Sequence, residues 1–188
     1  MTSSGIFGGT FDPIHFGHLR TAFELLQALR LNEIRFMPAG NPPHREVTVA
    51  SPAERYAMVK AAIAGQPGFV VDDREIRREG LSYSVDTMRT LRADFPDHSL
   101  SLIVGMDAFL GLPKWHQWRE LLVDRGTGRS GDLHEKRAGC IYIHAVTQLE
   151  ISSTEVRKLI AAGRDPRYLM PDGVREIIEQ TGCYRSKR

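Results

Sequence analysis

Hydrophobic and polar residues follow two different periods along the chain. Short, largely apolar runs are typical of buried strands, and they occur at residues 4–8, 33–38, 69–72, 99–105 and 140–145. Between most of these runs, apolar side chains recur every three or four residues, as on the buried face of a helix. This second pattern predicts helices at residues 17–30, 51–65, 85–94, 107–122, 153–163 and 172–181.

The helix predicted at residues 51–65 has the most clearly marked ends. Ser51 is a candidate N-cap, Pro52 suits the first helical position, and Glu54 completes a capping box. Gly65 then provides a stop at the C-terminal end of the helix.

The alternation of strands and helices predicts parallel strands joined by right-handed crossovers. We therefore expect an α/β protein with a Rossmann-like, doubly wound parallel sheet and helices on both faces. Residues 1–188 would form a single domain, with a small C-terminal helical part from about residue 165 to 188. Residues 123–139 are rich in glycine and charge, so we expect a loop there, and the charge cluster at 74–79 is expected to be solvated surface.

Composition excludes several classes of protein. The chain has 188 residues, 41% hydrophobic side chains and a formal net charge of +2, so no charge excess demands nucleic acid or an anionic membrane. Cys140 and Cys183 are too few for a disulfide scaffold. The sequence shows no recognisable signal peptide and no apolar run long enough to span a bilayer. We therefore expect a cytoplasmic protein without a nucleic-acid or membrane partner.

The most informative stretch is GGTFDPIHFGH at residues 8–18, directly after the first predicted strand. Gly8 and Gly9 let a phosphate approach the backbone closely, because they carry no Cβ. His15 and His18 lie three residues apart, so both imidazoles can donate to one anionic group at a helix start. A phosphate undergoing substitution would be stabilised in this way without a covalent intermediate. Two other interpretations stay open here: a tight turn with incidental histidines, and a metal site, although no third ligand lies at a suggestive spacing.

A second candidate site is ISSTEVR, at the start of the helix predicted at residues 153–163. Ser152 or Ser153 is a candidate N-cap, and Thr154 adds a hydroxyl in the first turn. Arg157 projects one turn later, where its planar guanidinium could hold phosphate oxygens. A plain capped helix with a solvated arginine also explains this segment taken alone. Together with the glycine and histidine motif, the segment favours a triphosphate site.

Three further segments offer aromatic or polar side chains near predicted helix starts. Trp115 and Trp118 could stack on a flat ring, although a buried tryptophan is as often part of a core. Ser84, in SYSVDT, suits a carboxylate or phosphate, or it simply caps a helix. Asp107 follows a predicted strand, where it could accept from ribose hydroxyls, hold Mg²⁺ or cap a short helix.

The combination of GGTFDPIHFGH and ISSTEVR resembles the nucleotidyltransferase superfamily that carries the H-x-G-H signature. The segments PAGNPPHR, SYSVDT, GMDAF, LPKWHQW and YLMPDGV resemble bacterial nicotinate-nucleotide adenylyltransferases in particular. The resemblance implies transfer of AMP from ATP to nicotinic acid mononucleotide by direct in-line attack, giving nicotinic acid adenine dinucleotide and pyrophosphate in NAD biosynthesis. It also implies Mg²⁺ that is bound mainly through the ATP phosphates.

The resemblance assigns roles to individual residues. The catalytic residues would be Thr10, His15, His18 and Arg157. ATP would bind to Gly8, Gly9, Thr10, Phe11, His15, His18, Gly105, Asp107, Ser153, Thr154 and Arg157. The mononucleotide would bind to Asn41, His44, Arg45, Ser84, Asp86, Thr87, Asp107, Trp115 and Trp118. No residue would be a dedicated metal ligand.

One segment departs from this family's pattern. Between Trp118 and residues 140–145, the family normally has a further apolar strand and an Arg-Pro-Gly turn, where this chain has the polar VDRGTGRSGDLHEKRAG. Either an element has been lost or residues are missing between Leu122 and Cys140. We expect the second, because loss of a strand would remove many buried contacts.

Other functions share part of this sequence pattern. Adenylyl transfer to nicotinamide mononucleotide or to phosphopantetheine would use the same ATP motifs. A non-catalytic nucleotide-binding module would keep only the fold, since a fold does not establish an activity.

Overall fold

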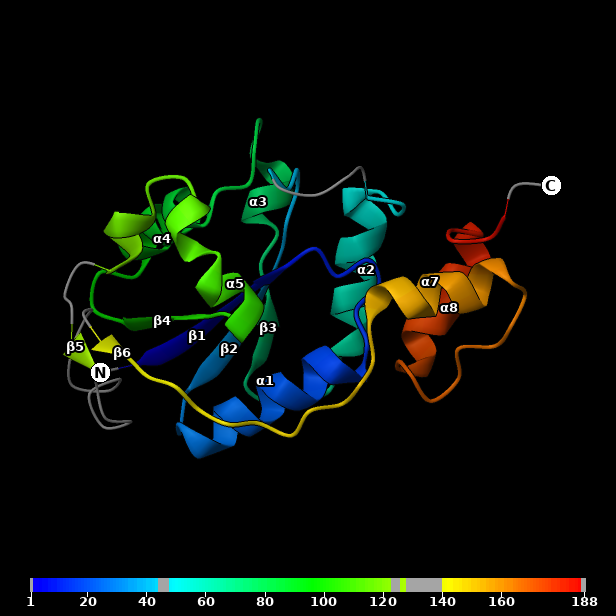
Figure 1. Cartoon of the computed structure of the whole chain (residues 1–188), viewed down its shortest axis with the longest axis horizontal. Helices are drawn as coiled ribbons and strands as arrows, with labels where there is room; N and C mark the ends of the chain where they lie inside the picture. Colours follow the sequence, from blue (N-terminus) through cyan, green and yellow to red (C-terminus); the bar gives the residue numbers. More distant parts are fainter. Residues whose placement is uncertain (1, 44–47, 123–125, 128–139, 187–188) are drawn as a thin grey trace.

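A four-stranded parallel sheet lies at the centre of the molecule (Figure 1). The computed structural model describes residues 2–43, 48–122, 126–127 and 140–186. The strands of this sheet are β1 (Ser3–Gly9), β2 (Glu33–Pro38), β3 (Phe69–Val71) and β4 (Ser99–Ile103), in the order β3-β2-β1-β4. The chain proceeds outward from β1 to β3 and then crosses back to place β4 on the other side of β1. The two directions of winding meet between β1 and β4, which is where such sheets bind ligands.

The main helices follow the sequence prediction in order and nearly in extent. They are α1 (Phe16–Ala28), α2 (Pro52–Ala62), α4 (Ser84–Asp94), α7 (Ser153–Ala161) and α8 (Asp172–Thr181). The predicted capping box is confirmed, because the Ser51 hydroxyl accepts from the Glu54 N–H and the Glu54 carboxylate accepts from the Ser51 N–H. α2 ends shortly before Gly65, which has a left-handed φ of 77°.

The helical stretch predicted at residues 107–122 is broken into three short pieces. They are the helix α5 (Met106–Leu110) and two 3-10 helices, η1 (Leu112–Lys114) and η2 (Trp118–Leu122). Pro113 lies inside this stretch and has no N–H to donate, so a continuous helix there would lose a hydrogen bond.

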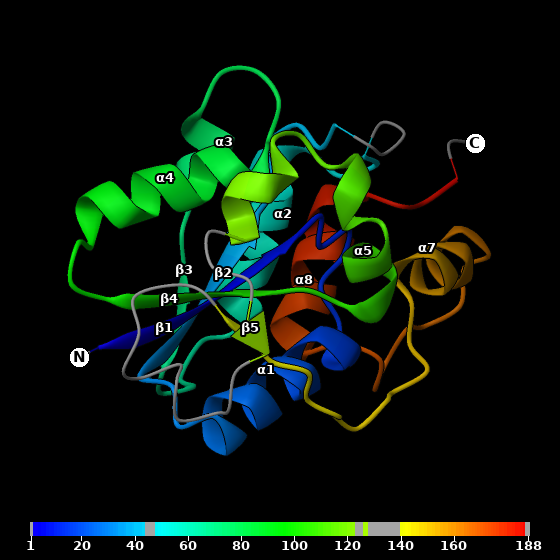
Figure 2. The same cartoon turned by 60° about the vertical axis from the view of Figure 1, so that its left-hand side comes forward.

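Helices cover both faces of the sheet (Figures 1 and 2). On β2, Ile34 and Phe36 belong to the larger core cluster, which includes side chains from α1, α2, α7 and α8. Met37 points to the opposite face, where Ile6 of β1 and Leu91 of α4 form a second, smaller cluster with it. Successive side chains of β2 thus point to opposite faces of the sheet, and helices cover both faces. The predicted doubly wound fold is confirmed.

Two predictions outside these elements are wrong. Residues 74–79, expected as solvated surface, contain the short helix α3 (Arg74–Arg77), and the side chain of Glu75 is buried against the Thr87 hydroxyl. Of the strand expected at residues 140–145, only β6 (Cys140–Ile141) is paired. Its partner is β5 (Gly126–Thr127) and not the central sheet, so the rest of that segment has no ladder to join. Most of the loop expected at residues 123–139 lies outside the described residues.

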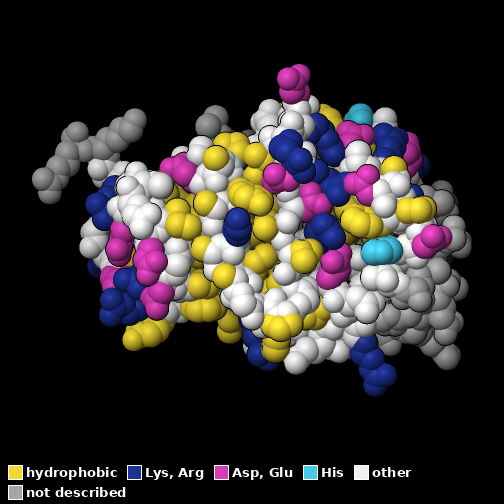
Figure 3. Space-filling view, turned by 180° about the vertical axis from the view of Figure 1, so that it is seen from behind, with side chains coloured by type: hydrophobic (Ala, Val, Ile, Leu, Met, Phe, Trp, Pro, Cys, Tyr) yellow, Lys and Arg dark blue, Asp and Glu magenta, His cyan; other side chains and the backbone are white. Residues whose placement is uncertain are grey.

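The described surface mixes charges of both signs. On the face opposite to that of Figure 1, Lys and Arg side chains alternate with Asp and Glu, and apolar side chains lie between them (Figure 3). This distribution agrees with the small formal net charge of +2. None of the helices in the described part of the chain is long and apolar enough to cross a membrane.

Candidate functional site

The loop after β1 begins the candidate site (Figure 2). A Cβ on Gly9 would lie 2.8 Å from the Phe11 ring, so glycine is needed for that ring to fold back over the strand end. Phe11 has a left-handed φ of 51°, and its side chain is only 2% exposed. Its ring packs edge-on against the His18 ring, with centroids 5.1 Å apart. Phe11 can therefore offer a ligand its backbone, while its side chain belongs to the core.

His15 and His18 lie together at the start of α1. Their rings stack with centroids 3.8 Å apart and planes inclined by 29°. The His15 backbone N–H donates to Nδ1 of His18 over 3.3 Å. That nitrogen is therefore an acceptor, and the proton of a neutral His18 imidazole is assigned to Nε2. This hydrogen bond thus fixes which His18 nitrogen carries the proton of the neutral imidazole.

His15 is the more deeply buried of the two histidines. Its side chain is 5% exposed, and burial lowers the pKa of His15 from 6.5 to about 4, so the imidazole is neutral near pH 7. Its Nδ1 atom is buried and has no hydrogen-bond partner among the described residues. This atom faces the first turn of α1, where the His15 side chain and the His18 backbone N–H are arranged as half of a capping box, although their geometry falls short of a hydrogen bond.

The first turn of α7 is bonded to the same loop. The Ser152 hydroxyl accepts from the Glu155 N–H, which confirms Ser152 as the N-cap. Ser153 Oγ donates to the Pro13 carbonyl over 3.0 Å, and Nη1 of Arg157 donates to the Asp12 carbonyl over 2.7 Å. The structure therefore brings together the two motifs that the sequence analysis paired. We call residues 8–18 and 151–157 the phosphate side of the site.

The tryptophan segment is attached to the start of α4. The rings of Tyr83 and His116 stack with centroids 4.3 Å apart. Arg89 of α4 donates to the side chains of Gln117 and Glu120. Both tryptophans are half-buried. We call the residues expected to bind the mononucleotide here the acceptor side: Asn41, Ser84, Asp86, Asp107, Trp115 and Trp118.

The loop after β2 reaches the same region through Asn41. The Asn41 backbone N–H donates to the Ser82 hydroxyl, and the Ser82 N–H donates to the Asn41 carbonyl over 2.8 Å. Asn41 is exposed, and these two bonds place it beside Ser82, which comes two residues before α4 in the sequence. His44 and Arg45, predicted in the same loop, lie outside the described residues.

Two predicted residues, Thr87 and Asp86, are placed less favourably for their roles, whereas a third, Asp107, is accessible. Thr87 is buried, and its hydroxyl donates to the Glu75 carboxylate over 2.6 Å, so it is held away from any substrate. Asp86 forms an ion pair with Arg89 at 2.9 Å. Asp107 is exposed in the first turn of α5, and Gly105 precedes that turn as its N-cap.

Sequence reasoning missed three residues that form hydrogen bonds behind the phosphate side. Arg55 is entirely buried on α2, Asp12 is buried within the loop, and Tyr184 follows α8. Asp12 belongs to the motif GGTFDPIHFGH, between Thr10 and His15, so its position could have identified it as a candidate. Arg55 and Tyr184 carry no local signal, because their partners are distant in the sequence.

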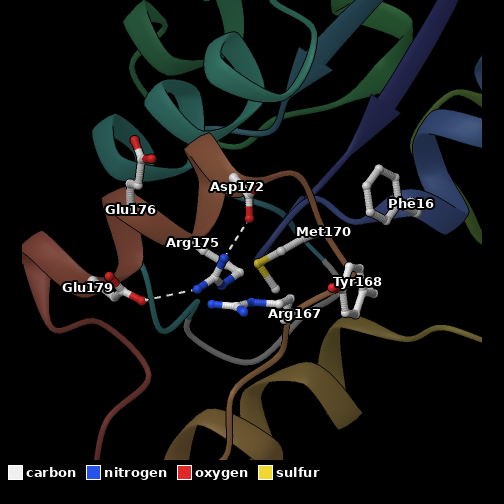
Figure 4. Close-up of a pocket in the computed structure, with 8 residues that line it drawn as sticks. All are labelled: Phe16, Arg167, Tyr168, Met170, Asp172, Arg175, Glu176 and Glu179. Atoms are coloured by element: carbon white, nitrogen blue, oxygen red, sulfur yellow. Dashed lines mark hydrogen bonds and ion pairs between the residues drawn. The ribbon is translucent and has the colours of Figure 1, made fainter.

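A separate cavity of about 490 Å³ lies beside α8 (Figure 4). It is lined by Phe16, by the loop before α8 and by the first turns of that helix. Arg175 lies in its wall, where it is paired with Asp165 at 3.2 Å and with Asp172. None of the residues predicted from sequence to bind ATP or the mononucleotide lines this cavity, so we do not assign it to the site.

Comparisons with known proteins identify chains that this one is similar to. Residues 6–159 match the family described as "Cytidylyltransferase-like". A protein of Aeromonas hydrophila named "Probable nicotinate-nucleotide adenylyltransferase" is 44% identical, and the match covers 96% of each chain. A protein of Halorhodospira halophila with the same name is 42% identical over 98% of this chain and 96% of the relative.

Solved structures show the same fold. The "Plasmodium falciparum nicotinic acid mononucleotide adenylyltransferase complexed with NaAD" superposes with a TM-score of 0.74 at 17% identity, covering 98% of each chain. The same enzyme "complexed with APC" superposes with a TM-score of 0.72 at 16% identity, again over 98% of each chain.

The relatives are longer than this chain within the matched region. Their alignments run over 206 and 209 positions, although this chain has only 188 residues. They therefore carry residues that this chain lacks. With identity above 40% over nearly the whole length of both chains, the protein belongs to the nicotinate-nucleotide adenylyltransferase family, within the cytidylyltransferase-like proteins.

Proposed function

We propose that this chain transfers the AMP group of ATP to nicotinic acid mononucleotide, giving nicotinic acid adenine dinucleotide and pyrophosphate. The observation that carries the proposal is the stacked pair His15 and His18 at the start of α1, with Arg157 of α7 bonded to the preceding loop. A helix N-terminus, two imidazoles and a guanidinium favour a polyphosphate. The choice of acceptor rests on the names of the relatives.

The reaction is a single substitution at the α-phosphorus of ATP. An oxygen of the mononucleotide phosphate attacks this phosphorus, and the bond to the bridging oxygen of pyrophosphate breaks with its electron pair leaving on pyrophosphate. The attacking oxygen is already ionised near neutral pH, so no general base has to remove a proton. Catalysis then depends on positioning the two phosphates and on stabilising the charge that develops between them.

The phosphate side supplies that stabilisation. We assign to the Nε2–H of His18 a hydrogen bond to a non-bridging oxygen of the α-phosphate. Arg157 would neutralise charge on the departing pyrophosphate, because its guanidinium presents several donors in one plane. The other groups would bind the triphosphate: the Thr10 and Thr154 hydroxyls, the His15 imidazole, the backbone N–H of Ser153 at the start of α7, and the backbone of Gly8, Gly9 and Phe11.

Mg²⁺ would enter the site with ATP and neutralise part of the phosphate charge. Among the described residues, no group of three or more His, Cys, Asp or Glu side chains is arranged to hold a metal ion. The exposed carboxylate of Asp107, just beyond the end of β4, is of a type that contacts Mg²⁺ directly or through water. We therefore propose that ATP supplies most of the ligands of this ion.

The acceptor side would bind the mononucleotide. Trp115 and Trp118 offer ring faces for a pyridine ring. Asn41 and Ser84 offer donors for its carboxylate, and Asp86, although paired with Arg89, offers an acceptor for its ribose hydroxyls. We assign no direct contact to Thr87, because Glu75 already accepts from its hydroxyl.

A coupled assay of pyrophosphate release tests this function. ATP and Mg²⁺ are supplied with nicotinic acid mononucleotide, nicotinamide mononucleotide or phosphopantetheine in parallel. We expect the largest kcat/KM with nicotinic acid mononucleotide. A larger value with either of the other acceptors would identify that acceptor as the substrate, and no release with any of them would support a non-catalytic nucleotide-binding module.

We also propose that the reaction takes place in the cytoplasm.

A further inference from the structure

We propose that Asp12, Arg55 and Tyr184 act together as positioning residues for the phosphate side, so that the C-terminal segment helps to set the geometry for AMP transfer. We call these three residues the Asp12 network. The proposal rests on the proposed function, although part of its test does not. None of the three residues is among those assigned to substrate.

Arg55 connects three segments of the chain. Its side chain is 0% exposed, and its guanidinium donates to the carbonyls of Thr10, Gly40 and Ala50 over 2.8, 3.2 and 3.3 Å. Thr10 belongs to the loop after β1, on the phosphate side, and Gly40 directly precedes Asn41 of the acceptor side. A planar guanidinium holds several carbonyls at fixed relative positions better than an ammonium does. Arg55 therefore sets the spacing between the loops after β1 and β2.

Asp12 anchors the loop from within. Its Oδ2 accepts from the Val49 N–H over 2.9 Å, and its Oδ1 accepts from the Ala50 N–H over 3.1 Å. The backbone carbonyl of the same residue accepts from Arg157. Asp12 therefore connects the loop after β1 both to the segment before α2 and to Arg157 of α7.

Tyr184 brings the C-terminus into this arrangement. Its hydroxyl donates to Oδ1 of Asp12 over 2.6 Å, although 172 positions separate the two residues in the sequence. Burial and the hydrogen bond to Asp12 raise the pKa of Tyr184, so the phenol stays protonated and remains a donor. Just before α8, the Leu169 carbonyl also accepts from the Phe16 N–H over 2.9 Å. The C-terminal part thus holds the segment from Asp12 to Phe16 at both ends. His15 lies within this segment, and His18 lies two residues beyond it.

The physical consequence concerns turnover more than binding. ATP can still bind to a loop that has moved slightly, because many donors contact its phosphates. The transfer step requires the α-phosphorus to lie in line with the attacking oxygen, and small displacements there are costly. Loss of one hydrogen bond in the Asp12 network should therefore lower kcat while leaving the ATP affinity nearly unchanged.

The test compares Tyr184→Phe with Ile178→Val. The first variant removes only the hydroxyl that donates to Asp12. The second removes one buried methyl group from α8 and so weakens the packing of the same C-terminal helix without touching the network. Tyr168→Phe makes the same chemical change as the first variant at an exposed tyrosine. All are assayed well below their melting temperatures.

For Tyr184→Phe we expect a fall in kcat of about tenfold, an unchanged dissociation constant for a non-hydrolysable ATP analogue, and faster hydrogen exchange of the Val49 and Ala50 amides. Ile178→Val and Tyr168→Phe should stay within twofold of wild type in all three measurements. Equal behaviour of Tyr184→Phe and Ile178→Val would overturn the proposal.

Arg55→Lys provides a second variant that keeps the charge but cannot reach three carbonyls. If it folds, we expect a larger loss of kcat than for Tyr184→Phe, and the two losses should not add in the double variant, because the residues belong to one network. Additive losses would contradict a shared role. If the wild-type protein released no pyrophosphate, the proposed function would fail, and the hydrogen-exchange comparison would still decide whether Tyr184 orders the loop.

Discussion

The phosphate side and the acceptor side of the site differ in how firmly their residues are held. On the phosphate side, His15 is buried, and α7 is bonded to the loop through Ser153 and Arg157. On the acceptor side, the half-buried tryptophans lie on or beside short 3-10 helices. The ion pair that connects them to α4 joins Arg89 and Glu120, which are 48% and 52% exposed. Exposed pairs of this kind contribute little to stability.

This difference corresponds to two different tasks. Charge develops at the α-phosphorus during the reaction, and donors that already point there need no reorganisation at that moment. The acceptor side has to admit a nucleotide and release a much larger product, so a surface that adjusts to its ligand is suitable there. We infer that the phosphate side is preorganised and that the acceptor side reaches its final geometry with substrate.

The largest effect is expected for His18→Ala on the phosphate side. The variant removes the Nε2–H donor, and loss of one such donor typically lowers kcat by about 100- to 1,000-fold. The dissociation constant of an ATP analogue should rise by much less, because the other phosphate contacts remain. Steady-state kinetics and calorimetry measure the two quantities.

His144→Ala is the matched control, since His144 is an exposed histidine outside both sides of the site. A kcat near that of wild type for His18→Ala would show that His18 does not contact the transferred group. A large loss of ATP affinity with little loss of kcat would mean that His18 only binds the substrate.

The second prediction concerns the burial of His15. The pKa of His15 is about 4 in the folded protein, against 6.5 for a histidine side chain in water. The unfolded chain therefore binds more protons between these two values, and the free energy of unfolding falls as pH falls from 6.5 to 4. For a shift of this size, protonation linked to His15 lowers the free energy of unfolding by on the order of 3 kcal/mol, and the full decrease is reached only below pH 4.

Urea unfolding at several pH values, with wild type and His15→Gln, isolates this contribution. The difference in unfolding free energy between the two proteins should change between pH 7 and pH 4, in favour of the variant at low pH. A difference that stays constant over this range would contradict the burial of a neutral imidazole.

Local sequence signals account for most of the fold and for the phosphate side. The Ser51 capping box depends on residues within one turn, and so does the pair of histidines at the start of α1. The apolar run of β2 likewise lies within six consecutive residues. These features could be predicted because their causes lie within a few positions of one another in the chain.

The features that could not be predicted have distant causes. Arg55 and Tyr184 acquire their roles only when α2, the loop after β1 and the C-terminus meet. Thr87 has the residue type and helix position of a ligand-binding hydroxyl, yet α3 places the Glu75 carboxylate against it. The family resemblance therefore made Thr87 a candidate, but the packing of α3 determined its role.

On the acceptor side, Trp115→Ala should raise the KM for the mononucleotide by about tenfold. Stacking of a flat ring on an aromatic side chain contributes roughly 1–3 kcal/mol. The KM for ATP should stay within twofold, because Trp115 is not among the phosphate contacts. Trp115→Phe keeps an aromatic face and should recover most of the loss. A fall in kcat without a change in KM would indicate that Trp115 shapes the phosphate side instead.

The smallest effect is expected for Thr87→Val, which separates a structural role from a substrate contact. Burial raises the pKa of Glu75, and the Thr87 hydroxyl opposes this by donating to the carboxylate. Removing that donor from a buried carboxylate should lower the free energy of unfolding by about 1–2 kcal/mol. The KM for the mononucleotide should stay within twofold, and Thr87→Ser should restore most of the stability by restoring the hydroxyl. Unchanged stability together with a raised KM would show that Thr87 contacts the mononucleotide. It would also mean that the hydrogen bond from Thr87 to Glu75 breaks when substrate binds.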